Sequence, residues 1–107
     1  MPSPLLELCD AATVGAEAPC RAEGAGSVYA VFKLGDGYYV MADACTHGPG
    51  ALSEGSVIGD EVECPFHQGR FDIKTGLPTF PPCSEPVRVW TARVVDGRVC
   101  IQPDQKR

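Results

Sequence analysis

Two cysteine–histidine pairs constrain the fold of this sequence more than any other feature. Cys45 and His47 are separated by one residue, and Cys64 and His67 by two. Sixteen residues lie between His47 and Cys64, and the 107-residue chain has no other histidine. Thiolates and imidazoles are ligands for borderline and soft metals. We therefore expect a fold that brings two loops together around a metal centre formed by these four side chains.

The composition of each pair bears on which metal it holds. Two cysteines and two histidines can bind a tetrahedral zinc ion, but zinc fingers usually group cysteine with cysteine and histidine with histidine. The single-residue gap between Cys45 and His47 also makes it awkward for both side chains to reach one ion. A Rieske-type cluster instead has one iron bound by two cysteines and the other by two histidines. A mixed pair in each loop supplies one ligand to each iron, which favours the cluster over zinc.

Two further readings of the pairs are weaker. Four unrelated residues would not place both histidines within three residues of a cysteine. A catalytic cysteine–histidine pair is chemically possible, but it leaves the second pair without a role.

The rest of the sequence reads mostly as β-strand, with 12 glycines and 10 prolines marking frequent turns. No long 3.6-residue apolar pattern indicates a helix, although a helical turn near residues 10–14 is possible. Residues 35–37 and the Asp96-Gly97 pair predict tight hairpin turns. We expect an all-β fold of antiparallel sandwich or barrel-like sheets. The predicted strands cover residues 27–34, 38–42, 61–64, 70–73, 87–95 and 98–102.

Charge and hydropathy limit the partners that we expect. The formal net charge is −5, and no run of lysine or arginine is present to contact phosphates. We therefore expect no nucleic-acid partner. The sequence shows no signal-peptide pattern and no apolar stretch long enough to cross a membrane. We expect a cytoplasmic monomer.

The residues around both pairs follow a known pattern. Residues 45–48 read Cys-Thr-His-Gly, residues 51–55 read Ala-Leu-Ser-Glu-Gly, and residues 64–72 read Cys-Pro-Phe-His-Gln-Gly-Arg-Phe-Asp. These segments resemble Rieske ferredoxins of bacterial aromatic-ring dioxygenase systems. The proline-rich segment at 75–86 and the closing hairpin agree, so the resemblance covers essentially the whole chain.

The resemblance implies a fold, a cofactor and a role. It implies one Rieske domain over residues 1–107, with a cluster-binding subdomain of two loops at about 43–86. It implies one 2Fe–2S cluster held by Cys45, His47, Cys64 and His67. The protein would carry single electrons from a flavin-containing, NAD(P)H-dependent ferredoxin reductase to a terminal oxygenase with its own Rieske centre and mononuclear iron. It would have no catalytic residues of its own.

Four positions depart from the high-potential Rieske proteins of quinol-oxidising complexes. Those proteins have a disulfide-forming cysteine at the positions of Gly50 and Phe66, and hydroxyl donors at those of Gly69 and Phe71. Hydrogen bonds to the cluster sulfurs stabilise the reduced state. Their loss predicts a potential of about −150 mV, at the low end of the Rieske range.

Two other functions are compatible with parts of the sequence. An oxygenase would need a 2-His-1-carboxylate iron site, for which this chain has no remaining histidine. A Rieske-like small subunit of another reductase, such as assimilatory nitrite reductase, has similar length and fold but often lacks the full ligand set.

Several residues outside the pairs also carry predictions. We expect Trp90 to serve packing, and we consider Phe66, Phe71 and Phe80 as apolar covers over the centre, with Pro81 and Pro82. The remaining cysteines are expected to be buried or half-buried thiols that bind no metal: Cys9, Cys20, Cys83 and Cys100.

Overall fold

The computed structural model describes residues 5–46, 50–66, 68–81 and 84–103, where the regular secondary structure is β-strand apart from two short 3-10 turns. Three antiparallel sheets have the strand orders β1-β11-β10, β2-β3-β4-β9 and β5-β6-β7-β8. The elements are β1 (Leu6–Asp10), the 3-10 turn η1 (Ala11–Thr13), β2 (Cys20–Gly24), β3 (Ser27–Leu34), β4 (Gly37–Ala42), the 3-10 turn η2 (Leu52–Glu54), β5 (Ser56–Ile58), β6 (Glu61–Glu63), β7 (Arg70–Asp72), β8 (Pro78–Phe80), β9 (Val89–Thr91), β10 (Arg93–Val95) and β11 (Arg98–Ile101). In this described part of the chain, no helix is both long and apolar enough to span a membrane.

The sheet β2-β3-β4-β9 is central because both of its faces are buried. Tyr29 and Val31 of β3 pack on one face, while Ala30 and Phe32 pack on the other. A continuous run of β-branched and aromatic residues suits such a strand, since successive side chains point to opposite faces. The central sheet therefore separates two hydrophobic cores.

The first core lies between the central sheet and the sheet β1-β11-β10. Trp90 of β9 packs edge-on against Tyr29, with ring centroids 4.9 Å apart, and its indole N–H donates to the carbonyl of Pro103 at 3.0 Å. Val99 and Ile101 of β11 complete this core. Trp90 thus serves packing, as the sequence predicts.

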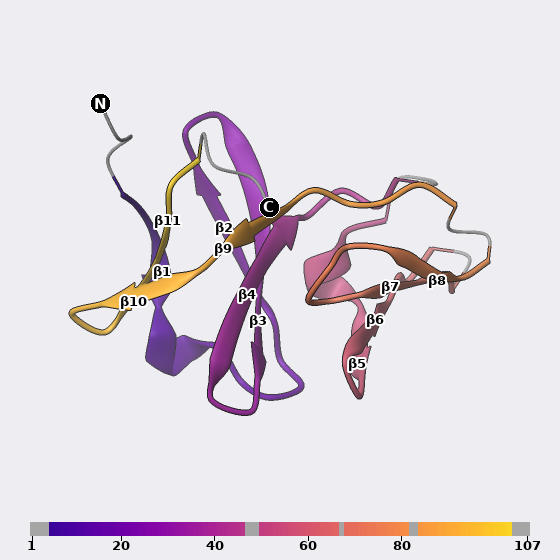
Figure 1. Ribbon diagram of the computed structural model, residues 1–107, viewed down its shortest axis with the longest axis horizontal. Coiled ribbons are helices and arrows are strands. Elements are labelled where there is room, and N and C mark those ends of the chain that lie inside the picture. Colours follow the sequence, from indigo (N-terminus) through magenta and orange to yellow (C-terminus); the bar gives the residue numbers. More distant parts are fainter. Residues whose placement is uncertain (1–4, 47–49, 67, 82–83, 104–107) are drawn as a thin grey trace.

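The second core lies between the central sheet and the small sheet β5-β6-β7-β8, which occupies the opposite end of the molecule from β10 (Figure 1). Val62 and Phe71 of the small sheet pack there with Phe32 and Met41 of the central sheet. Both cysteines of the predicted metal centre belong to this core, so the predicted centre lies at the small-sheet end of the molecule.

Most of the predicted strands are confirmed. β3 and β4 form the expected hairpin, and Asp96 and Gly97 have the positive φ angles, 51° and 77°, of a type I′ turn. The single strand predicted over 87–95 is wrong. The chain leaves the central sheet after β9 and enters the outer sheet as β10, so Ala92 marks a change of sheet. The strands β1, β5 and β8 were not predicted from the sequence.

Candidate metal centre

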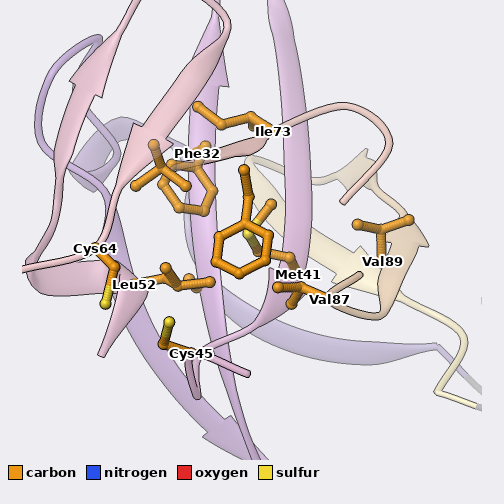
Figure 2. Packing of buried hydrophobic residues seen from close by; sticks show 11 residues of the cluster. Phe32, Met41, Cys45, Leu52, Cys64, Ile73, Val87 and Val89 are labelled. Carbon is orange, nitrogen blue, oxygen red and sulfur yellow. The ribbon is translucent and has the colours of Figure 1, made fainter. Parts of the chain in front are cut away.

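The four predicted ligands come from two loops at the small-sheet end of the molecule. Cys45 lies in the loop between β4 and η2, and Cys64 directly follows β6. His47 and His67 lie outside the described residues. Cys45 is 5 % exposed and Cys64 is fully buried. Figure 2 shows both cysteines at the same end of the second core, beside Leu52.

Each of the two cysteine loops is closed by a backbone hydrogen bond of the same type. The N–H of Cys45 donates to the carbonyl of Gly50 at 2.9 Å, and the N–H of Cys64 donates to the carbonyl of Gly69 at 2.8 Å. In each case the acceptor lies five residues after the cysteine, and each loop includes a predicted histidine ligand in its sequence. The fold therefore builds two matching loops, which is what a centre that draws one Cys and one His from each loop requires.

Gly50 brings the two loops into contact. A Cβ atom at this position would lie 2.5 Å from Sγ of Cys64 and 3.0 Å from Cβ of Phe66. Both distances are too short for an ordinary side chain without movement of the neighbours. Glycine is thus required here for close approach between the loops.

The thiol of Cys64 is held in its neutral form when no metal is bound. The pKa of this thiol is raised to about 11, mainly by burial, with a smaller contribution from the neighbouring Cys45 thiol. The N–H of Phe66 opposes this shift by donating to Sγ of Cys64 at 3.4 Å. A metal ligand must be deprotonated, so metal binding here would displace a proton and leave a thiolate that already has one hydrogen-bond donor.

The chemistry and placement of these groups fit the cysteine half of a 2Fe–2S site. Two thiols on separate loops lie together at the edge of an apolar core, and a backbone N–H points at one sulfur. N–H donors to ligating sulfur are among the interactions by which proteins tune iron–sulfur clusters. Cys45 and Cys64 would hold one iron of such a cluster.

Two residues that the sequence analysis did not single out support the first loop. Thr46 Oγ1 donates to the carbonyl of Glu85 at 2.8 Å and so ties the loop to the proline-rich segment. Asp43 is buried two residues before Cys45 and accepts a hydrogen bond from Ser53. A carboxylate directly after an apolar strand was the only available signal for Asp43.

The three candidate apolar covers differ in exposure. Phe71 is fully buried within the second core, whereas Phe66 is 37 % exposed and Phe80 is 52 % exposed. The guanidinium of Arg70 lies 5.2 Å from the centre of the Phe80 ring and pairs with Glu63 at 3.3 Å. Phe71 is therefore a core residue, while Phe66 and Phe80 leave apolar surface open to a partner.

Where the structure describes them, the remaining cysteines are buried or half-buried, as predicted. Cys9 and Cys20 are half-buried thiols that interact with one another, and Cys100 is a buried thiol in β11. Cys83 and Pro82 lie outside the described residues.

Comparison with known proteins identifies the chain's relatives. The family model described as the Rieske [2Fe-2S] domain matches residues 5–91. The chain is 44 % identical to ferredoxin CarAc of Metapseudomonas resinovorans over 77 residues, which is 72 % of each chain. It is 54 % identical over 70 residues to the anthranilate 1,2-dioxygenase ferredoxin subunit of Burkholderia cepacia, and the match covers 65 % of each chain.

Solved structures show the same fold. The ferredoxin of Sphingomonas yanoikuyae B1 superposes with a TM-score of 0.89 at 35 % identity, covering 92 % of this chain and 98 % of that one. A chain from the complex of reduced oxygenase and oxidized ferredoxin in carbazole 1,9a-dioxygenase gives 0.87 at 38 % identity, covering 96 % and 95 %. An NADPH nitrite reductase small-subunit protein shares the fold at 23 % identity, with a TM-score of 0.77 and coverage of 92 % and 97 %.

The matched range contains both buried cysteines, both closing glycines, and the strands β6 and β7 that flank the second loop. The two-loop geometry and the sequence match point to one conclusion: this chain belongs to the Rieske [2Fe–2S] domain family and is similar to the ferredoxin components within it.

Proposed function

We propose that this protein is the electron-carrying ferredoxin of an aromatic-ring dioxygenase system. The observation that carries the proposal is the pairing of Cys45 and Cys64, buried side by side on two matching loops. It is supported by relatives named as a ferredoxin and as a dioxygenase ferredoxin subunit, at 44 % and 54 % identity. The carrier has no catalytic turnover of its own, and its relatives are named as components of larger systems.

The proposed cofactor is one 2Fe–2S cluster, and its proposed ligands are Cys45, His47, Cys64 and His67. When bound, the cluster accepts and releases one electron. Cys45 and Cys64 hold the iron on the buried side. Leu52 and the apolar core exclude water from the two sulfurs, while Phe66 donates its N–H to Sγ of Cys64.

The proposal also includes a domain organisation. We take residues 1–107 as one Rieske domain in which about residues 43–86 form the cluster-binding subdomain. This assignment is supported by the second core, where β6 and β7 pack on the central sheet through Val62 and Phe71.

The partners of the proposal are a flavin-containing reductase that draws electrons from NAD(P)H and a terminal oxygenase that receives them. A chain of similar fold stands in a complex with the carbazole 1,9a-dioxygenase oxygenase. Exposed apolar side chains at the small-sheet end, Phe66, Leu77 and Phe80, suit a small transient contact. The use of intracellular NAD(P)H supports a cytoplasmic location, and the net charge of −5 argues against nucleic acid. We expect the carrier to act as a monomer.

The ligand assignment is tested by metal analysis and EPR of the purified protein. Two irons and two acid-labile sulfides per chain are expected, and the dithionite-reduced protein should give the lower average g value of mixed Cys/His ligation. Changing Cys45 or Cys64 to serine should remove most of the iron, while Cys100→Ser, at a buried thiol in β11, should retain it. Zinc, or an all-cysteine EPR signal, would overturn the assignment.

The electron-transfer role is tested with partners. The reduction potential should lie near −150 mV, and the reduced protein should pass electrons to an aromatic-ring oxygenase in stopped-flow mixing. A clearly positive potential, or exclusive transfer to a nitrite reductase, would contradict the role.

A further inference from the structure

Asp43 is the only buried polar or charged residue in the described part of the chain, with 4 % of its surface exposed. A buried carboxylate is costly unless it is paired and hydrogen-bonded. Asp43 lies between the end of β4 and Cys45, where an apolar residue could continue the core. The hydrogen bonds and the ion pair of Asp43 must therefore offset the cost of burying its charge.

The main chain and side chain of Asp43 together close the first cysteine loop. Its N–H donates to the carbonyl of Val28 in β3 at 3.1 Å, which anchors the residue to the central sheet. Its carbonyl accepts the N–H of Leu52 at 2.7 Å, and its Oδ1 accepts the N–H of Ser53 at 2.7 Å. One residue at the start of the loop thus binds two consecutive amides at its end.

The second carboxylate oxygen of Asp43 faces a cation. Nε of Arg21 in β2 lies 3.6 Å from Oδ2, and the Arg21 side chain is 54 % exposed. Arg21 also pairs with Glu23 at 2.8 Å, on the solvent side, where the Glu23 side chain is 64 % exposed. The buried negative charge is therefore balanced by one arginine that reaches it from the surface.

A buried charge near a redox centre affects its potential. Reduction adds one negative charge to the cluster, so a nearby carboxylate disfavours reduction and a nearby cation favours it. These effects are strong in an apolar interior and weak for exposed, screened groups. Asp43 is buried two residues before the predicted ligand Cys45, so its charge should act on the centre. Glu23 pairs with the same Arg21 but is exposed to solvent, so its charge should act weakly.

We propose that Asp43 is a positioning residue that holds the first ligand loop closed, and that its negative charge lowers the reduction potential of the centre while Arg21 offsets this effect. The inference rests on the proposed function, because it takes Cys45 as a cluster ligand. The carboxylate has two separable roles: Oδ1 fixes the loop through Ser53, and the negative charge disfavours electron uptake, an effect that the positive charge of Arg21 offsets.

The experiment separates the two roles with matched variants of the cluster-loaded protein. Asp43→Asn keeps an oxygen acceptor for Ser53 but removes the charge, while Asp43→Ala removes both. Arg21→Gln removes the balancing cation. Glu23→Gln makes the same change in charge as Asp43→Asn, but at an exposed group. The readouts are the midpoint potential, the EPR g values and the rate at which iron is lost to a chelator.

The expected shifts have opposite signs. The midpoint potential should rise in Asp43→Asn, fall in Arg21→Gln and return close to the wild-type value in the double variant, while Glu23→Gln changes it little. Asp43→Ala should lose iron about fivefold faster than Asp43→Asn, as expected for the loss of one neutral hydrogen bond of about 1 kcal/mol. The EPR g values should stay of the mixed Cys/His type in Asp43→Asn.

The inference is overturned if Asp43→Asn and Arg21→Gln shift the potential in the same direction, or if neither exceeds the shift in Glu23→Gln. Should the Asp43 variants fail to fold, the exposed Arg21→Gln and Glu23→Gln variants decide the electrostatic part alone. Failure of the proposed function is distinct, because the wild-type protein would then lack two irons, two sulfides or the mixed-ligand EPR signal.

Discussion

Gly50 faces Sγ of Cys64 so closely that a Cβ atom at position 50 would lie 2.5 Å from the sulfur. This relationship joins residues 14 positions apart on two different loops. Because any larger residue at position 50 would push against Cys64, glycine is needed there for the two cysteine loops to pack together.

Gly50→Ala should therefore impair cluster binding more than folding. Forcing a methyl group into a packed contact costs about 1–3 kcal/mol, and here the strain falls on Cys64 and Phe66. We expect a severalfold lower iron content with an unchanged far-UV CD spectrum. Gly35→Ala is the control: its backbone conformation, with φ of 59°, disfavours alanine, but its Cβ would meet nothing within 4 Å, so it tests backbone strain without the contact. Equal iron loss in both variants would contradict the prediction.

Leu52→Ala should destabilise the small-sheet end of the molecule. Leu52 is fully buried beside both cysteines, and truncation of a buried leucine costs about 2–5 kcal/mol. Denaturant unfolding measures this loss, and the cluster absorbance should bleach at lower denaturant than in the wild type. Leu77→Ala makes the same change at a side chain that is 55 % exposed and should alter stability by about 0.5 kcal/mol or less. Similar losses in the two variants would show that Leu52 does not support the loops.

Cys9 should make stability depend on pH in the alkaline range. Burial, followed by the neighbouring Cys20, raises the pKa of Cys9 from 9.0 to about 11 in the folded protein. Between these values the unfolded chain has lost the thiol proton while the folded protein retains it, so stability should fall as pH rises from about 9 to about 11. Below pH 9 both states are protonated and Cys9 contributes no pH dependence. Urea unfolding across this range should give a shallower decline in Cys9→Ala; an unchanged slope would contradict the assignment.

Phe80→Ala should slow electron transfer to the oxygenase without changing the reduction potential. Phe80 is 52 % exposed at the small-sheet end and lies under the guanidinium of Arg70. Loss of one apolar contact of about 1 kcal/mol would reduce the second-order rate about fivefold. Val94 offers a control, because it is 46 % exposed on β10 at the opposite end of the molecule (Figure 1). Stopped-flow rates should be unchanged in Val94→Ala, and equal slowing in both variants would place the contact elsewhere.

Local patterns made much of the fold predictable. The β3–β4 hairpin and the Asp96-Gly97 turn depend on short-range conformational preferences, which the sequence carries directly. The break at Ala92 was not predictable in this way. Residues on both sides of it favour strand, and only the positions of β4 and β11 decide that β9 joins one sheet and β10 another.

The sequence by itself was enough to predict the chemistry of the centre. The types and spacing of Cys45, His47, Cys64 and His67 indicated a mixed-ligand iron–sulfur site, because ligand preference is a property of the side chains. Only the tertiary structure decided how the site is supported. The contact of Gly50 with Cys64 and the hydrogen bond from Ser53 to Asp43 join residues that are distant in sequence. No local preference encodes such contacts, since they exist only after the two loops have packed against the same core.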